Sequence, residues 1–167
     1  TATPTLIPPT ATPTLPILAE RVLVISVDGL RAAVVDHFQM PNTYALMQSG
    51  TYATAARTTF PSATLPSHAS MLTGMCPDKH GVDWNDYIPE NGFAASPSVF
   101  EIAHEAGLRT VMVVGKEKLI QLTPPEIVDP YDYVNDRDSV VAERAARAAA
   151  TRHDAMVQEH VPLEHDC

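Results

Sequence analysis

Three polar residues in the first half of the chain could together perform nucleophilic chemistry: Asp28, Thr64 and Asn85. Asp28 directly follows the apolar run RVLVISV, an expected buried strand, and open α/β sheets bind ligands at the carboxyl ends of their strands. Thr64 stands in FPSATLPSHASMLTG, where a helix is expected to begin, and backbone N–H groups at a helix start favour an anion. Asn85 follows in HGVDWND, and its amide N–H suits an oxygen that gains negative charge in a transition state.

The Thr64 hydroxyl has two interpretations. Serine and threonine often cap helices, and proline is favoured in the first turn, so a purely structural N-cap is one interpretation. A threonine nucleophile needs an adjacent base or a metal ion that lowers the pKa of its hydroxyl. No nearby histidine has an obvious claim to be that base, whereas Asp28 at a strand end suits a metal ligand. If Thr64 is a nucleophile, the residue pattern therefore favours activation by a metal ion.

The segments VLVISVDGLR and TTFPSATLPSHASMLTGMCPDKHGV, followed by Asn85, resemble the nucleotide pyrophosphatase/phosphodiesterase family (type I phosphodiesterases) of the alkaline phosphatase superfamily. The resemblance spans residues 20–121, since VVGKEKL at 113–119 is also similar to bacterial members. It makes the nucleophile interpretation of Thr64 outweigh the cap. The positions that match the family motif in order are Phe60, Pro61, Thr64, Pro66, His68, Thr73, Gly74, Pro77, His80 and Gly81.

The resemblance implies a hydrolase of phosphodiester or pyrophosphate bonds that uses two divalent metal ions, usually zinc. In that pattern Asp28 binds one ion, which also holds the Thr64 oxygen, and Thr64 attacks phosphorus to form a phospho-threonine. A water activated by the other ion then hydrolyses this intermediate. Asn85 holds a phosphoryl oxygen. The implied partner is a small phosphorylated substrate, either a phosphodiester or a nucleotide.

The second metal site is only partly present in the sequence. The family also needs an Asp-His pair, an Asp-x-x-Gly-His motif and a distal histidine. The terminal VPLEHDC resembles the start of the second motif, with Asp166 as the metal ligand, although a solvated acidic terminus is an equal alternative. Glu164 is a weaker candidate, and His68 and His80 are expected to be structural. We therefore expect the chain to be an incomplete, inactive fragment of the enzyme.

Several substrate classes stay open. Leu65 stands where vertebrate members carry an aromatic residue that stacks on a nucleobase, so nucleotide preference is undecided. Trp84 or Tyr87 could provide a stacking face, but packing is the more common role of such residues. A phosphomonoesterase, a phosphonate hydrolase and a sulfatase-like hydrolase on the same fold are the enzyme alternatives. Sulfatases carry Cys or Ser at the Thr64 position, which favours phosphorus over sulfur.

Positive charge near the site would help to separate these classes. Phosphate monoesters carry more negative charge than diesters, so additional lysine or arginine would favour them. The cations visible in the sequence, Arg31, Arg57 and Lys79, do not decide this point. The non-enzyme alternative is a stalk-tethered binding domain that has lost its metals.

Composition limits the partners of the chain. Its 167 residues contain 20 Asp and Glu against 11 Lys and Arg, for a net charge of −9. This balance argues against sequence-independent binding of duplex nucleic acid, which depends on basic residues. No apolar run is long enough to predict a membrane span. Residues 1–18 are rich in Thr and Pro and are expected to form a disordered, extended linker. Such linkers are typical of proteins outside the cell, so a secreted or cell-surface location is expected. The two cysteines, Cys76 and Cys167, do not indicate a disulfide framework.

Alternating strand and helix patterns predict the fold. Together they indicate an α/β fold with a doubly wound, mostly parallel sheet and helices on both faces, similar to alkaline phosphatase and truncated at the C-terminus. Residues 19–167 would form the N-terminal part of this catalytic domain. The helix expected at 96–107 would bury Val99, Ile102, Ala103 and Ala106. The expected strands are 21–27, 51–58, 109–115 and 154–161, and the expected helices are 40–50, 64–73, 96–107 and 138–152.

Overall fold

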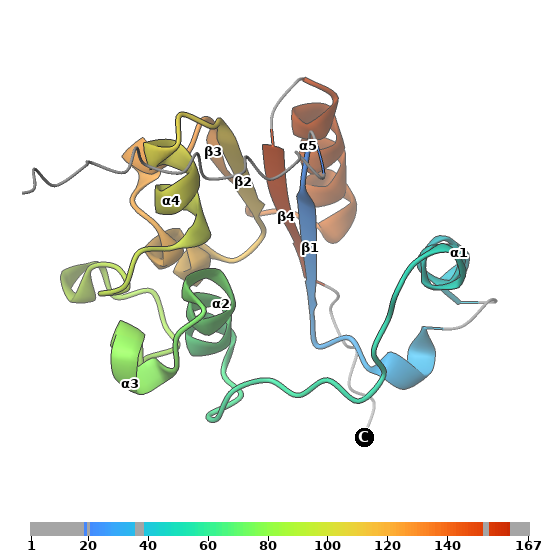
Figure 1. Cartoon of the computed structure of the whole chain (residues 1–167), viewed down its shortest axis with the longest axis horizontal. Helices are drawn as coiled ribbons and strands as arrows, with labels where there is room; N and C mark the ends of the chain where they lie inside the picture. Colours follow the sequence, from blue (N-terminus) through green and yellow to red (C-terminus); the bar gives the residue numbers. More distant parts are fainter. Residues whose placement is uncertain (1–18, 20, 36–38, 152–153, 161–167) are drawn as a thin grey trace, which may run out of the picture.

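The computed structural model describes residues 19, 21–35, 39–151 and 154–160, in which four parallel strands form one sheet (Figure 1). The strand order is β1–β4–β2–β3. Three strands confirm the sequence prediction, and β3 was missed because it is only three residues long. The bounds are β1 Leu23–Asp28, β2 Thr110–Val114, β3 Tyr131–Tyr133 and β4 Asp154–His160. The register places Asp28 opposite His160, so β1 and β4 end at the same edge of the sheet.

Helices connect these strands, and in the described residues none of them is long and apolar enough to cross a membrane. Four helices lie where the sequence predicts them, and the turn-long α3 was not expected. The α-helices are α1 Pro41–Ser49, α2 Thr64–Thr73, α3 Pro77–His80, α4 Val99–Glu105 and α5 Asp138–Ala150. Short 3-10 helices occupy η1 Ala32–Val34, η2 Pro89–Asn91, η3 Glu117–Leu122 and η4 Pro125–Ile127.

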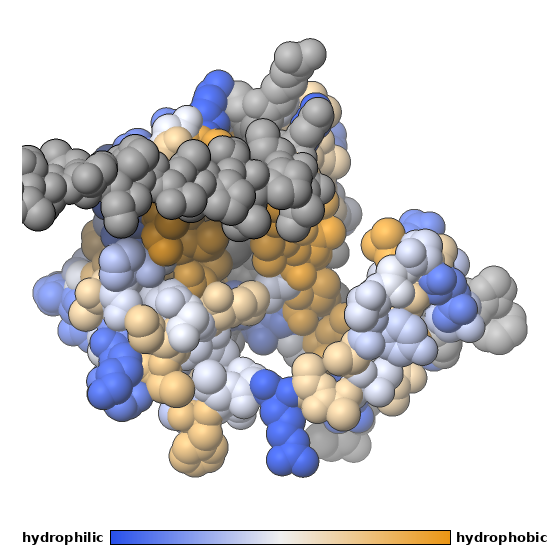
Figure 2. Space-filling model, viewed as in Figure 1, coloured by the Kyte–Doolittle hydropathy of each residue, from blue (hydrophilic) through white to orange (hydrophobic). Residues whose placement is uncertain are grey.

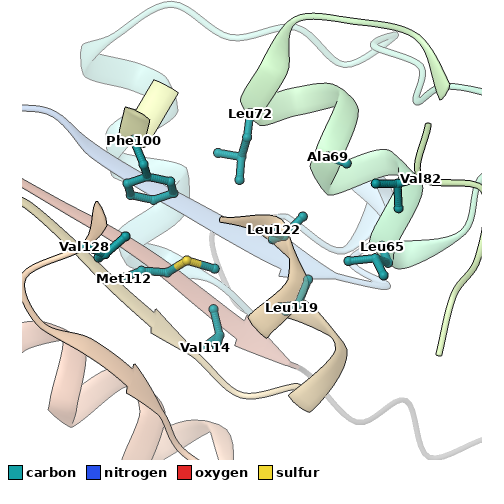
Figure 3. Close-up of a cluster of buried hydrophobic side chains, with 10 residues drawn as sticks. All are labelled: Leu65, Ala69, Leu72, Val82, Phe100, Met112, Val114, Leu119, Leu122 and Val128. Atoms are coloured by element: carbon teal, nitrogen blue, oxygen red, sulfur yellow. The ribbon is translucent and has the colours of Figure 1, made fainter. Parts of the chain in front are cut away.

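Strand β2 is buried on both faces, which explains its uninterrupted apolar sequence. On one face, Met112 and Val114 pack against side chains from α2, α4 and η3, as Figure 3 shows. On the other face, Val111 and Val113 pack against Val141 and other residues of α5. The structure is thus a mixed α/β fold with a small parallel sheet. The doubly wound architecture of a larger sheet remains a prediction.

Helix α2 is positioned by an apolar stripe and a glycine. Leu65, Ala69 and Leu72 recur at helical spacing and are buried in the core cluster of Figure 3. Gly74 ends the helix in the left-handed conformation, at φ 68°, and its N–H bonds to the Ser70 carbonyl. The stripe faces the sheet, so the first residue of α2, Thr64, lies beside the end of β1.

Strand β1 is more exposed than its sequence predicts. RVLVISV reads as a fully buried strand, yet the side chains of Val22, Leu23, Val24 and Ile25 are exposed. The reason is the position of β1 at the edge of the described sheet, where α2 contacts only the second half of the strand, at Ser26. Figure 2 shows hydrophobic side chains gathered over this strand.

The strand expected at residues 51–58 is absent: the segment has no regular structure and is exposed. Its side chains are mainly small or polar, and such residues bury too little apolar surface to hold an extra strand. The segment instead crosses the surface from α1 to α2 (Figure 1).

The buried face of α4 also differs from the prediction. Val99 and Ile102 are 52% and 60% exposed, whereas Phe100 is only 4% exposed. A capping box fixes the rotation of the helix, because the Ser98 hydroxyl accepts the Glu101 N–H and the Glu101 carboxylate accepts the Ser98 N–H. With Ser98 fully buried at the helix start, Phe100 faces the core. The phenyl ring has a larger apolar area than the side chains of Val99 and Ile102, so its burial favours this rotation of the helix.

The core makes a direct prediction about stability. Leu122 is 2% exposed and belongs to the cluster of Figure 3, while Leu108 is 54% exposed. Leu122→Ala should lower the free energy of unfolding by about 2–5 kcal/mol, since it leaves a cavity. Leu108→Ala is the matched control and should change it by about 0.5 kcal/mol or less. Chemical denaturation measures both, and equal effects would contradict the packing described here.

His80 joins α3 to α2 as a neutral side chain. Its Nδ1 atom accepts the Val82 N–H at 3.1 Å, so the proton of the neutral ring is on Nε2, which lies 2.9 Å from the Ser70 hydroxyl. Burial lowers the pKa of His80 below its usual 6.5. These contacts agree with the structural role expected for this histidine.

Stability should therefore depend on pH through His80. The unfolded chain takes up a proton near pH 6.5, while the folded chain resists protonation until the pH is lower. The free energy of unfolding should fall as the pH decreases below about 6.5, and His80→Gln should remove part of that fall. Denaturation between pH 5 and 7.5 measures the effect, with His104→Gln at an exposed position as the control. An unchanged pH profile in His80→Gln would contradict the prediction, because it would mean that folding does not lower the pKa of this ring.

Candidate functional site

The structure brings Asp28 and Thr64 together. Asp28 is the last residue of β1, and Thr64 is the first residue of α2. The Thr64 hydroxyl donates a hydrogen bond to the Asp28 carboxylate, with 3.1 Å between Oγ1 and Oδ2. The N-cap position belongs to Ala63, whose side chain makes no capping hydrogen bond. The hydroxyl of Thr64 is thus directed at a carboxylate rather than used as a helix cap.

His68 connects the start of α2 to β1 from inside the protein. Its Nδ1 atom lies 2.7 Å from the Thr64 carbonyl oxygen, which can only accept, so Nδ1 carries the proton. Its Nε2 atom lies 2.8 Å from the Ser26 hydroxyl, which donates to it when the ring is neutral. Burial is the main cause that lowers the pKa of His68 and favours this neutral form. The ring therefore links the first turn of α2 to Ser26, which lies two residues before Asp28 in β1.

Asn85 lies at the same helix start. Its Oδ1 atom accepts the Leu65 N–H at 3.0 Å, and its side chain is otherwise exposed to solvent. Because the oxygen is used in this way, the amide group presents its Nδ2 donors elsewhere. Within the described part of the chain, Nδ2 makes no hydrogen bond. Asn85 therefore satisfies a free N–H of α2 and keeps two donors available beside Thr64.

Lys116 is a site residue that the sequence analysis did not identify. It follows β2, and its ammonium group forms an ion pair and a hydrogen bond with Oδ2 of Asp28. The signal was present in the sequence, because Lys116 follows one buried strand much as Asp28 ends another. Parallel strands end at the same edge of a sheet, which brings the two charges together.

The Asp28 carboxylate is ionised at neutral pH. Burial raises the pKa of Asp28. The hydrogen bond and the charge of Lys116, together with the hydrogen bond from Thr64, outweigh burial, so the pKa lies below its usual value. Both donors converge on the same oxygen. The site thus holds a fixed negative charge whose partners are one hydroxyl and one ammonium group.

A hollow of about 820 Å³ opens beside this pair. Its wall is formed by the end of β1, residues 56–59, the first turns of α2 and the residues after α2. Two hydroxyl groups on this wall, those of Thr59 and Ser67, are buried and have no hydrogen-bond partner among the described residues. Their oxygens are shielded from solvent, and the Thr64 hydroxyl is a third hydroxyl group on the same wall.

The oxygens of Asp28 and Thr64 fit part of a metal site. Their oxygens lie 3.1 Å apart, so one divalent ion could be held by both, and carboxylate oxygen is a common zinc ligand. Catalytic zinc usually has three protein ligands, and no cluster of three or more His, Cys, Asp or Glu exists in the described residues. The two other ligand candidates, Asp166 and Glu164, lie outside the described residues.

Other residues that the sequence singled out serve packing or the surface. Leu65, next to Thr64, is fully buried in the core cluster of Figure 3. Trp84 packs against the same cluster and donates from Nε1 to Gln121 Oε1 at 3.3 Å. Lys79 pairs with its neighbour Asp78 on the surface. Of the three cations named from the sequence, only Arg57 lines the hollow.

Comparison with known proteins agrees with the sequence motif. The model of the family described as type I phosphodiesterase/nucleotide pyrophosphatase matches residues 22–160. An uncharacterized pyrophosphatase/phosphodiesterase of Schizosaccharomyces pombe is 34% identical over 67 residues, which are 40% of this chain and 14% of that protein. The bis(5'-adenosyl)-triphosphatase of Xenopus laevis is 32% identical over 62 residues, 37% of this chain and 14% of that protein. Venom phosphodiesterase 2 of Crotalus adamanteus is 32% identical over 71 residues, which are 41% of this chain and 9% of that protein.

The chain covers between 9% and 14% of the length of these relatives. The family model, in contrast, extends over most of the chain and includes the strand that ends at Asp28 and the helix that begins at Thr64. The resemblance seen in the sequence is thereby confirmed, and the chain belongs to the type I phosphodiesterase/nucleotide pyrophosphatase family.

Proposed function

We propose that the full-length protein hydrolyses phosphodiester or pyrophosphate bonds of a small phosphorylated substrate, with Thr64 as the nucleophile. The observation that carries this proposal is the hydrogen bond from the Thr64 hydroxyl to the ionised Asp28 carboxylate, beside an open hollow. A threonine that only capped the helix, or one that only faced solvent, would not need a hydrogen bond to a carboxylate. The relatives named as phosphodiesterases and as a triphosphatase support the same reaction class.

The residues of the chain divide the work of the first step. The Thr64 oxygen forms a bond to phosphorus while the bond to the leaving oxygen breaks; Thr64 loses its proton to solvent and the leaving oxygen takes one up. Water later cleaves the new bond, which releases the phosphorylated product and restores the Thr64 hydroxyl. Asp28 accepts the hydroxyl proton in a hydrogen bond and so fixes the direction of the Thr64 oxygen. His68 holds the backbone of the nucleophile from behind.

Divalent metal ions complete the proposed site. Asp28 and Thr64 would hold one ion, which when bound lowers the pKa of the hydroxyl and offsets phosphoryl charge. The proposal includes a second ion, zinc being the expected metal, with Asp166 as a candidate ligand. The paired oxygens support the first of these sites.

A phosphate monoester or phosphonate is a second candidate substrate, and Lys116 favours it. The ammonium group adds positive charge next to the nucleophile, and more highly charged phosphoryl groups gain more from such a partner. A sulfatase reaction is less compatible, because Thr64 cannot be oxidised to the aldehyde that sulfatases use.

We also propose an extracellular location. The Thr/Pro-rich residues 1–18 support it, as does the similarity to a venom phosphodiesterase.

Removing the Thr64 hydroxyl tests the proposed reaction. In the full-length protein, Thr64→Ala should abolish hydrolysis of a chromogenic phosphodiester and leave metal content near that of the wild type. Thr64→Ser should keep measurable turnover, and Thr58→Ala, at an exposed threonine of the same hollow, is the control. If Thr64→Ala keeps turnover within about tenfold, equal to about 1.4 kcal/mol in barrier height, Thr64 is not the nucleophile.

Asn85 allows its two roles to be separated. Asn85→Asp keeps an oxygen for the Leu65 N–H but removes the amide donors, whereas Asn85→Ala removes both. We expect Asn85→Asp to reduce turnover by about 10²–10³, the usual loss for one oxyanion donor, with little change in thermal stability. Steady-state kinetics and thermal unfolding are the measurements. Normal turnover in Asn85→Asp combined with lower stability in Asn85→Ala would mean that Asn85 only caps the helix.

A further inference from the structure

We propose that Lys116 couples metal binding at Asp28 to anion binding at Thr64. In the metal-free protein its ammonium group holds the carboxylate, and when a metal ion takes the carboxylate, the ammonium group moves to an oxygen of the anion. This inference rests on the proposed function, since it concerns the same metal ion and the same phosphorylated substrate.

The position of the ammonium group is the first argument. It contacts Oδ2 of Asp28, the same oxygen that accepts the Thr64 hydroxyl. A metal ion touching both the Asp28 and Thr64 oxygens would therefore lie next to the ammonium group. The two cations would compete for one oxygen, and the lysine has to leave it before the metal can bind there.

Burial makes this competition strong. The side chains of Lys116 and Asp28 are only 21% and 27% exposed, so solvent screens their interaction with a metal ion weakly. An ammonium group within a few ångströms of a divalent ion is repelled by it. Lys116 should therefore weaken metal binding for as long as no other negative charge is present.

The second argument concerns the place to which the lysine can move. Lys116 is anchored at the start of η3, and its flexible four-carbon stem lets the ammonium group turn about that point. Asp28 is its only ion-pair partner among the residues that the structure describes. Once freed, the charge lies beside Thr64, where a phosphoryl oxygen would arrive, and that oxygen is the natural new partner.

Reciprocity turns this arrangement into a measurable coupling. If the anion removes the repulsion between Lys116 and the metal, then the anion tightens metal binding, and the metal tightens anion binding by the same factor. An ion pair that served the fold alone would produce neither effect.

The test measures the zinc affinity of the full-length protein by competition with a chromogenic chelator, with and without inorganic phosphate. Without phosphate, Lys116→Met should bind zinc about tenfold more tightly than the wild type, within the usual range of coupling between sites. Lys116→Arg keeps the charge and should stay near the wild type. Lys118→Met removes a charge from the same segment, at a residue without an ion pair in the described structure, and should change nothing.

Phosphate supplies the second readout. It should tighten zinc binding by about fivefold or more in the wild type and by less in Lys116→Met. Lys116→Gln provides the same neutral substitution if the methionine variant does not fold.

Equal or weaker zinc binding in both neutral variants would overturn the inference and make Lys116 a simple support for the carboxylate. The same gain in Lys118→Met would also overturn it, because the cause would then be net charge. If the wild type hydrolyses a phosphodiester through Thr64 while the neutral variants show no gain, only this inference fails. If the wild type neither binds zinc nor turns over substrate, the proposed function fails with it.

Discussion

The site depends on a single constraint: helix α2 has to begin where strand β1 ends. Asp28 is the last residue of β1 and Thr64 is the first residue of α2. The hydrogen bond between them requires the Thr64 hydroxyl and the Asp28 carboxylate oxygen to lie about 3 Å apart. Neither residue can adjust far, since one belongs to a paired strand and the other to the first turn of a packed helix. The surrounding structure can be understood as what holds these two ends in place.

Consecutive residues of α2 serve different purposes because a helix turns by about 100° per residue. Leu65 is directed into the core, where it anchors the helix on β2 and η3, while Thr64 is directed at the end of β1. His68, one turn later, returns to the Thr64 carbonyl and to Ser26. The packing of the helix and the orientation of its first hydroxyl are therefore set together. The apolar residue after Thr64, Leu65, contributes to this support and is therefore fully buried.

Local charge at the site differs from the charge of the whole chain. The chain is acidic, with a net charge of −9. Next to Thr64, however, the Asp28 carboxylate is paired with Lys116, and Asn85 adds neutral donors. An anionic substrate would meet this local balance rather than the average, because charges beyond about 10 Å are largely screened at physiological salt. The composition thus argues more strongly against binding of duplex nucleic acid than against binding of a small phosphorylated molecule.

The sequence by itself determined the elements and the family. Apolar runs predicted three of the four strands, and the motif from Phe60 to Gly81 identified the family and placed Thr64 at a helix start. These features are local, so they can be read from neighbouring residues. Prediction from the local pattern was wrong for residues 51–58 and for the buried face of α4. Both depend on which distant segments provide apolar side chains to pack against.

Only the tertiary structure decided how the site is assembled. Asp28 ends β1 and Lys116 follows β2, and β4 lies between these strands in the sheet, so the strand pattern of the sequence did not show that the two side chains meet. The atom of Asn85 that holds α2, and therefore the atoms left free, also follow from three-dimensional packing alone. The physical reason is that residue types set what a side chain can do, while strand order and helix docking set what it meets.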